Sequence, residues 1–150
     1  MADKNWNIYL SGEIHSDWRT RIIEGARARN LPVAFSGPVT DHDASDLCGV
    51  RILGEESDEY WRDRKGAGIN AIRTSSLIGR ADVVVVRFGP KFKQWNAAFD
   101  AGYAAALNKS LIILHDAEHD HALKEVDAAA NATARTPEQV VEILGYVLTS

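Results

Sequence analysis

The feature that most constrains the fold is a run of four consecutive valines, Val83 to Val86. A strand with one face in water alternates apolar and polar residues, so an unbroken β-branched run predicts a strand that is buried on both faces. Strands of this kind occur in parallel sheets that helices cover on both sides. The apolar run Leu111 to Leu114 has the same character. We therefore expect a parallel α/β sheet in which the valine strand is central.

Strand and helix patterns alternate along the whole chain, which implies right-handed βαβ units. The expected strands are 7–10, 33–35, 81–87, 111–114 and 132–134, and the expected helices are 17–29, 55–65, 70–80, 96–107, 121–130 and 138–148. A length of 150 residues fits one domain. The sequence thus predicts a single-domain α/β protein over residues 1–150, a flavodoxin-like or Rossmann-like three-layer sandwich with a five-stranded parallel sheet.

Between the second strand and the valine strand the pattern is less regular. Residues 39–54 are expected to form a loop that is longer than most connections in such folds, and loops of that length are often functional. Gly66 and Gly68 are expected to interrupt the helical pattern that follows. Near the end of the chain, Thr136 and Pro137 form a typical start for the last helix.

Composition narrows the choice of partner and compartment. Hydrophobic residues make up 45% and charged residues 25%, as in ordinary globular proteins. The net charge is −4 and no basic cluster stands out, which argues against a nucleic acid polymer as a partner. No apolar run approaches the roughly 18 residues of a membrane span, and the first residues do not resemble a signal peptide. The single cysteine, Cys48, fits a reducing compartment, so we expect a cytoplasmic protein without a membrane partner.

In an open α/β sheet, ligands bind beyond the carboxyl ends of the strands. The loops expected there carry Ser11, Gly12, Glu13, His15, Ser16, Asp17 and Arg19 after the first strand, Thr40, Asp41, His42, Asp43, Ser45, Asp46 and Cys48 after the second, and Arg87, Gln94, Trp95 and Asn96 after the valine strand. Asp100 lies one turn inside the next helix and is the first candidate for chemistry. This rim suits a small polar ligand with a planar part.

No cofactor is predicted. The sequence contains neither the Gly-x-Gly-x-x-Gly pattern of dinucleotide-binding proteins nor a P-loop. Ser11 and Gly12 could present a hydroxyl and backbone N–H groups to an anion, or could form only a tight strand-to-helix turn.

No metal is predicted either. The segment from Asp41 to Cys48 matches no zinc or calcium ligand spacing, so a structural loop is favoured over a substrate-binding rim and over a metal site. His115, His119 and His121 stand among acidic residues, which favours a solvated turn, although two of these histidines could flank a ligand.

Several segments carry a family resemblance. The stretch Tyr9-Leu10-Ser11-Gly12, the strand that begins Ala81-Asp82-Val83, and residues 99–109 (FDAGYAAALNK) resemble nucleoside 2-deoxyribosyltransferases and their hydrolase relatives. The chain as a whole, including residues 12–19 and 37–46, resembles the YtoQ family, a branch of that superfamily.

The resemblance implies a covalent mechanism and a set of site residues. It implies that Asp100 stands at the position of the nucleophilic glutamate, that Tyr9 helps to hold this nucleophile, and that the protein is a homo-oligomer whose neighbouring subunits help to build the site. A second acid must protonate the departing base, and Glu13 or Asp41 could serve. The expected substrate-binding residues are Ser11, Gly12, His15, Arg19, Asp41, Asp43, Arg73, Arg87, Trp95 and Asn96. Arg19, Arg73 and Arg87 would favour a phosphorylated ligand if they converge, and would be structural if they meet carboxylates instead.

The sequence departs from the parent enzymes at three positions. Asp100 replaces the glutamate, Asn96 stands where the parents have a glycine, and Thr74 stands where the hydrolase relatives have an aspartate. The shorter aspartate matters because about 1 Å of misplacement can cost roughly 100-fold in rate. Two functions therefore stay open. One is an enzyme that transfers or hydrolyses the N-glycosidic bond of a deoxynucleoside or deoxynucleotide, and the alternative is a non-catalytic protein that binds a nucleotide-like ligand.

Overall fold

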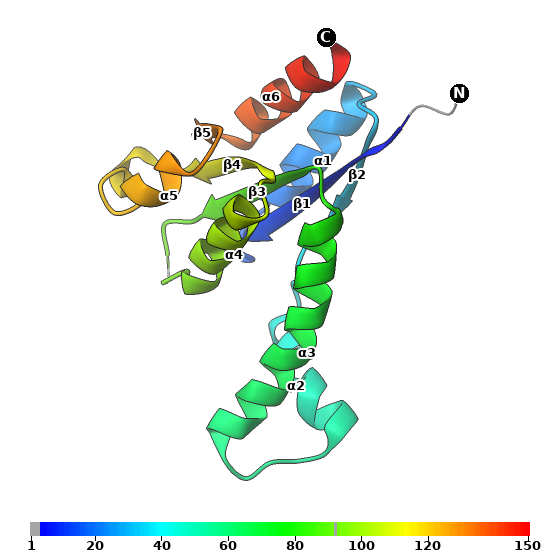
Figure 1. The fold of residues 1–150 in the computed structure, drawn as a ribbon, viewed down its shortest axis with the longest axis vertical. Coiled ribbons are helices and arrows are strands. Elements are labelled where there is room, and N and C mark those ends of the chain that lie inside the picture. The colour runs from blue at the N-terminus through cyan, green and yellow to red at the C-terminus, as the bar shows by residue number, and fades with distance from the viewer. Residues whose placement is uncertain (1–3, 92) are drawn as a thin grey trace.

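A computed structural model describes residues 4–91 and 93–150 and contains one five-stranded sheet, all of whose strands are parallel. The strands are β1 (Trp6–Gly12), β2 (Val33–Ser36), β3 (Val83–Phe88), β4 (Ser110–His115) and β5 (Ala132–Ala134), in the spatial order β2-β1-β3-β4-β5 (Figure 1). This is the flavodoxin-like order, with the valine strand β3 at the centre. The predicted fold class is confirmed.

Helices cover both faces of the sheet. They are α1 (Trp18–Ala28), α2 (His42–Leu53), α3 (Glu59–Arg80), α4 (Trp95–Ala106), α5 (Lys124–Ala128) and α6 (Pro137–Thr149), with a 3₁₀ turn at Ala117–His119. Val83 and Val85 pack with the apolar sides of α1 and α6. Val84 and Val86 point to the opposite face, where α4 and the end of α3 cover them. Alternate valines thus enter two different cores, which explains why the run has no polar member.

Two predictions about the segment before β3 are wrong. The expected loop 39–54 contains α2, because the Asp41 side chain caps this helix by accepting a hydrogen bond from the Ala44 N–H at 2.9 Å. The expected break at Gly66 and Gly68 does not occur, and α3 runs without interruption for 22 residues. Glycine serves close packing here: a Cβ added to Gly49 of α2 would lie 2.4 Å from the Gly66 nitrogen. The α2–α3 hairpin extends away from the sheet (Figure 1).

The expected helix 121–130 is also too long, since α5 spans only Lys124–Ala128. The prediction for the last helix is confirmed. The Thr136 hydroxyl accepts a hydrogen bond from the Gln139 N–H at 3.2 Å, and Pro137 occupies the first turn. Within the described residues, no helix has the length and apolarity that crossing a membrane requires.

Candidate active site

Two adjoining cavities lie beyond the carboxyl ends of β1 and β3. The smaller has a volume of about 380 Å³ and the larger about 580 Å³. Six residues line both cavities: Pro38, Val39, Ser45, Asp46, Asn96 and Asp100. Asp100, the carboxylate that the sequence analysis singled out, therefore lies between the two cavities and lines both. Each cavity is in the size range of small-ligand pockets.

Asp100 is partly buried and held from β1. The Ser11 hydroxyl, on a residue with 1% exposure, donates a hydrogen bond to Asp100 Oδ2 at 2.6 Å. Burial raises the pKa of the Asp100 carboxyl, and the hydrogen bond from Ser11 acts in the opposite direction. The structure thus fixes the orientation of this carboxylate while it removes part of its hydration.

Tyr9 points to the same region from the preceding part of β1. The residue is fully buried and lines the larger cavity together with Asp100. Among residues 4–91 and 93–150, its hydroxyl has no hydrogen-bond partner of good geometry. Burial and the nearby Asp100 raise the pKa of Tyr9, while the Thr74 side chain, Arg73 and Arg19 act against this rise. A bound ligand could give this buried hydroxyl a hydrogen bond of better geometry than Thr74 does.

The loop after β1 is shaped by its own polar groups. Gly12 has a φ of +111°, and an added Cβ would lie 2.1 Å from the Arg87 carbonyl oxygen, so only glycine fits. The two carboxylate oxygens of Glu13 accept hydrogen bonds from the His15 N–H at 2.7 Å and from the Ser16 hydroxyl at 2.9 Å. Ser11, Gly12, Glu13 and His15 all line the smaller cavity, as expected from the sequence.

The three arginines of the predicted binding set do not line one common cavity. Arg19 donates to the carbonyl oxygens of Leu10, Glu13 and Gly12 at 3.1, 2.6 and 3.0 Å, and burial lowers its pKa to about 10. Arg73 lines the larger cavity but donates to the Gly37 carbonyl at 2.6 Å. Arg87 lies 3.7 Å from a carboxylate oxygen of Asp116. Arg19 and Arg87 line neither cavity. Arg19 is held by carbonyl oxygens, whereas Arg87 Nε is buried without a hydrogen-bond partner among residues 4–91 and 93–150.

The start of α2 contributes three residues of the expected rim, but not Asp41 and Asp43, the two expected to bind substrate. Asp41 caps the helix and Asp43 is exposed on its first turn, and neither residue lines the two cavities. Instead, His42 lines the smaller cavity, while Ser45 and Asp46 line both. His42 Nδ1 lies 3.3 Å from Asp46 Oδ2. Because His42 and Asp46 are four residues apart, they lie on the same face of α2. The sequence analysis expected a loop here and therefore did not predict this pairing.

The loop between β3 and α4 adds two cations to the predicted residues. Trp95 and Asn96 line the smaller cavity as expected, and so do Lys91, Lys93 and Gln94. The Gln94 side chain accepts from the Gly89 N–H at 2.9 Å and donates to the carbonyl oxygens of Gly89 and Lys91 at 3.0 and 2.8 Å. A sequence signal for the lysines exists, because they lie in the loop that follows the central strand.

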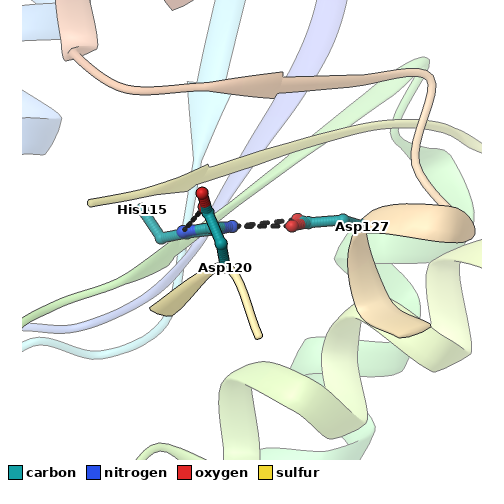
Figure 2. A group of neighbouring side chains, drawn as sticks. All are labelled: His115, Asp120 and Asp127. Carbon is teal, nitrogen blue, oxygen red and sulfur yellow. Dashed lines mark hydrogen bonds and ion pairs between the residues drawn. The ribbon is translucent and has the colours of Figure 1, made fainter. Parts of the chain in front are cut away.

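Three side chains of types that can bind a metal lie close together elsewhere, at His115, Asp120 and Asp127 (Figure 2). The fully buried His115 places Nε2 at 3.0 and 2.9 Å from the two Asp127 oxygens and Nδ1 at 2.8 Å from the Asp116 carbonyl oxygen. Asp120 accepts from Arg135 Nη1 at 2.6 Å. The polar atoms of these three side chains therefore already have partners, either within the group or in Arg135 and the Asp116 carbonyl. The group fastens the segment after β4 to the sheet.

Comparison with known proteins places this arrangement in a class. A conserved protein from Enterococcus faecalis V583 has a similar structure, with a TM-score of 0.65 and 14% identity, covering 97% of this chain and 100% of that one. A 2-deoxyribosyltransferase from Bacillus psychrosaccharolyticus has a TM-score of 0.55 and 14% identity, covering 90% of each chain. The fold is therefore one that a 2-deoxyribosyltransferase also adopts.

Sequence comparison then gives the particular family. The family described as "Nucleoside 2-deoxyribosyltransferase YtoQ" matches residues 9–148. The YtoQ protein of Bacillus subtilis (strain 168) is 44% identical over 140 residues, which is 93% of this chain and 95% of that protein. The chain belongs to the YtoQ family, and the resemblance noted in the sequence is confirmed.

Proposed function

We propose that the protein cleaves the N-glycosidic bond of a deoxynucleoside or deoxynucleotide and passes the sugar to another base or to water. One observation carries this proposal: Asp100 is a partly buried carboxylate, oriented by Ser11, in the wall that two ligand-sized cavities share. A carboxylate in that position can meet the anomeric carbon of a ligand that occupies both spaces.

The proposed reaction has two steps. In the first, an Asp100 carboxylate oxygen bonds to C1′ while the C1′–N bond breaks, and the electron pair of that bond leaves with the base. A nearby acid supplies the proton that the base takes up. In the second step, water or an acceptor base attacks C1′ and gives its proton to the acid of the first step, which is now a carboxylate, while the bond from C1′ to Asp100 breaks and the Asp100 carboxylate is restored. A 2-deoxy sugar favours this path because no 2-hydroxyl withdraws charge from the oxocarbenium-like transition state.

Tyr9 and an acid complete the proposed catalytic set. The role assigned to the buried Tyr9 hydroxyl is to hold the carboxylate or the sugar once substrate is bound; its position in the larger cavity supports this. Glu13 lines the smaller cavity and is the acid expected from the sequence. Asp46 is a second candidate, because it lines both cavities and its carboxylate lies beside His42. Replacing the acid, by Glu13→Gln or Asp46→Asn, should lower base release most at and below the pH optimum, where the acid is protonated in wild type, and should remove the fall in rate above the optimum.

We also propose that the protein is a homo-oligomer. The family resemblance supports this, and so do exposed aromatic side chains at the cavity rims: Trp95 and Phe99 are each 73% exposed. Light scattering on the purified protein tests it, and a monomer at all concentrations would contradict it.

Base release from a panel of deoxynucleosides and their 5′-monophosphates, followed by chromatography, tests the proposed activity. Wild type should release base, Asp100→Asn should not, and Glu142→Gln, an exposed carboxyl-to-amide change on α6, should match wild type. The alternative function is a binding protein without catalysis. That alternative holds if wild type releases no base although a nucleotide raises its melting temperature; at 100 times its dissociation constant a ligand adds about 2.7 kcal/mol.

A further inference from the structure

The larger cavity is lined by more negative than positive side chains. Its wall contains three carboxylates, Asp46, Asp63 and Asp100, and one cation, Arg73. The Arg73 guanidinium donates to the Gly37 carbonyl oxygen at 2.6 Å, and among residues 4–91 and 93–150 it forms no ion pair. The two lysines of the loop before α4 line only the smaller cavity. A ligand in the larger cavity therefore meets an excess of negative charge, which favours a cation.

Asp63 is the carboxylate of this wall with the fewest contacts to the protein itself. It lies on α3, is exposed, and forms no ion pair within the described part of the chain. By contrast, Asp46 lies 3.3 Å from His42 Nδ1, and Asp100 accepts the hydrogen bond from the Ser11 hydroxyl. The Asp63 charge is thus available to a positive group that enters the cavity.

Two aromatic residues indicate, independently of the carboxylates, that this cavity takes a planar ligand. Tyr9 lines it and is fully buried, yet its hydroxyl has no hydrogen-bond partner of good geometry among residues 4–91 and 93–150. Phe99 lines the same cavity and is 73% exposed. One face of the Phe99 ring stacks on Tyr103, with 6.5 Å between the ring centres and 2° between the planes. An exposed aromatic ring beside carboxylates attracts a planar cation.

The chemistry of the leaving base points to the same kind of ligand. Glu13, the acid expected from the sequence, lines the smaller cavity only, and both of its carboxylate oxygens accept hydrogen bonds from its own loop. A neutral base needs an acid to leave easily. A base that already carries a positive charge does not, because it becomes neutral when it takes the electron pair of the broken bond.

We propose that the larger cavity accepts a base with a fixed positive charge, a pyridinium or an N7-alkylated purine, so that the substrate is a cationic N-glycoside. Asp63 and Asp46 attract the charged ring, Phe99 stacks on it, and C1′ meets Asp100. This inference rests on the proposed function and narrows it by naming the chemical class of the base that leaves.

The two steps balance without an acid. An Asp100 oxygen bonds to C1′ while the C1′–N bond breaks, and the electron pair of that bond cancels the positive charge of the ring, which leaves as a neutral molecule. Water then attacks C1′, the bond from C1′ to Asp100 breaks, and the proton of the water passes to a carboxylate of the wall and from there to solvent. Hydrolysis of a cationic substrate therefore releases one proton in each turnover.

Titration followed by NMR tests the cation preference with 1-methylnicotinamide, a planar cation, and 3-methylbenzamide, its neutral isostere. Neither compound has a glycosidic bond, so wild type can be used without turnover. The cation should bind about tenfold tighter, a difference of about 1.4 kcal/mol. Asp63→Asn should reduce this ratio about threefold, as for an exposed charge pair, and should leave the binding of 3-methylbenzamide unchanged. Glu59→Gln, a carboxyl-to-amide change one turn earlier on α3 that lines neither cavity, is the matched control and should alter neither affinity.

An activity measurement separates this inference from the proposed function. Wild type should have a higher kcat/KM for release of nicotinamide from nicotinamide 2′-deoxyriboside, corrected for the rate without enzyme, than for base release from any of the four common deoxynucleosides. If a neutral deoxynucleoside is the better substrate, or if the cation binds no tighter than its isostere, the inference is wrong although the proposed function stands. The inference is also wrong if Asp63→Asn binds the cation as Glu59→Gln does. If the cation binds through Asp63 but no N-glycoside is cleaved, the cation site stands and the proposed activity is wrong.

Discussion

Replacing Gly49 by alanine tests whether the α2–α3 hairpin depends on backbone contact. A Cβ at Gly49 would lie 2.4 Å from the Gly66 nitrogen, 2.5 Å from the Lys65 carbonyl carbon and 2.5 Å from the Lys65 Cβ. Two of these three atoms belong to the backbone of α3, so the helices must separate. The position is also functional, because Ser45 and Asp46 reach both cavities from the same helix.

Two opposing effects set how much Gly49→Ala changes the free energy of unfolding. Alanine is about 1 kcal/mol more favourable than glycine inside a helix. Overpacking of a close contact costs about 1–3 kcal/mol or more. Gly68 lies in α3 with no atom within 4 Å of an added Cβ, so Gly68→Ala gains the helix term alone. Gly49→Ala should therefore be about 1–3 kcal/mol less stable than Gly68→Ala.

Urea denaturation of the two variants and wild type measures this difference. Gly68→Ala should have a higher midpoint than wild type, and Gly49→Ala a lower midpoint than Gly68→Ala, with weaker binding of any ligand that contacts Asp46. If Gly49→Ala is as stable as Gly68→Ala, the close packing of α2 on α3 is wrong.

Three further predictions concern the sheet and the site. Val84→Asp should prevent soluble folding, because Val84 is fully buried on the central strand and the new charge would have no partner; a soluble variant with a cooperative melt would refute this. Arg19→Met should lower the free energy of unfolding by about 2–4 kcal/mol, because three carbonyl oxygens lose a charged donor, and urea denaturation checks the value. Burial raises the pKa of Asp100, so the folded protein holds this proton more tightly than the unfolded chain does and the carboxyl destabilises the fold as pH rises. Asp100→Asn should hence melt higher than wild type at pH 8, with a difference that shrinks toward pH 3, and a lower melting temperature at pH 8 would contradict the cause given.

The sheet could be predicted from the sequence because its signal is local. Val83–Val86 and Leu111–Leu114 are apolar on both faces, and both lie in buried strands. The α2–α3 hairpin could not be predicted in the same way. Gly66 weakens a helix when it is considered alone, and its role is visible only when α2 lies against it. A cap such as Asp41 also resembles an ordinary loop aspartate until the helix behind it is known.

The candidate site, too, could be predicted from the sequence only in part. Asp100, Tyr9 and the loop from Ser11 to His15 line the cavities, and the sequence could bring them together because they lie in or after strands that the pattern predicts. The arginines could not be assigned, because a guanidinium group that binds carbonyl oxygens has the same sequence signal as one that binds a phosphate. Lys91 and Lys93 lie after the central strand and could have been included with the other rim residues on that ground.

The central claim is that Asp100 attacks the sugar. Incubation with 2′-deoxy-2′-fluoro nucleosides and nucleotides, followed by peptide mass spectrometry, tests it most directly, because fluorine at C2′ slows the breakdown of a glycosyl-enzyme more than it changes the site. We predict one sugar adduct per chain, on the peptide that contains Asp100, and none in Asp100→Asn. An adduct on Glu13, or full base release by Asp100→Asn, would contradict the claim.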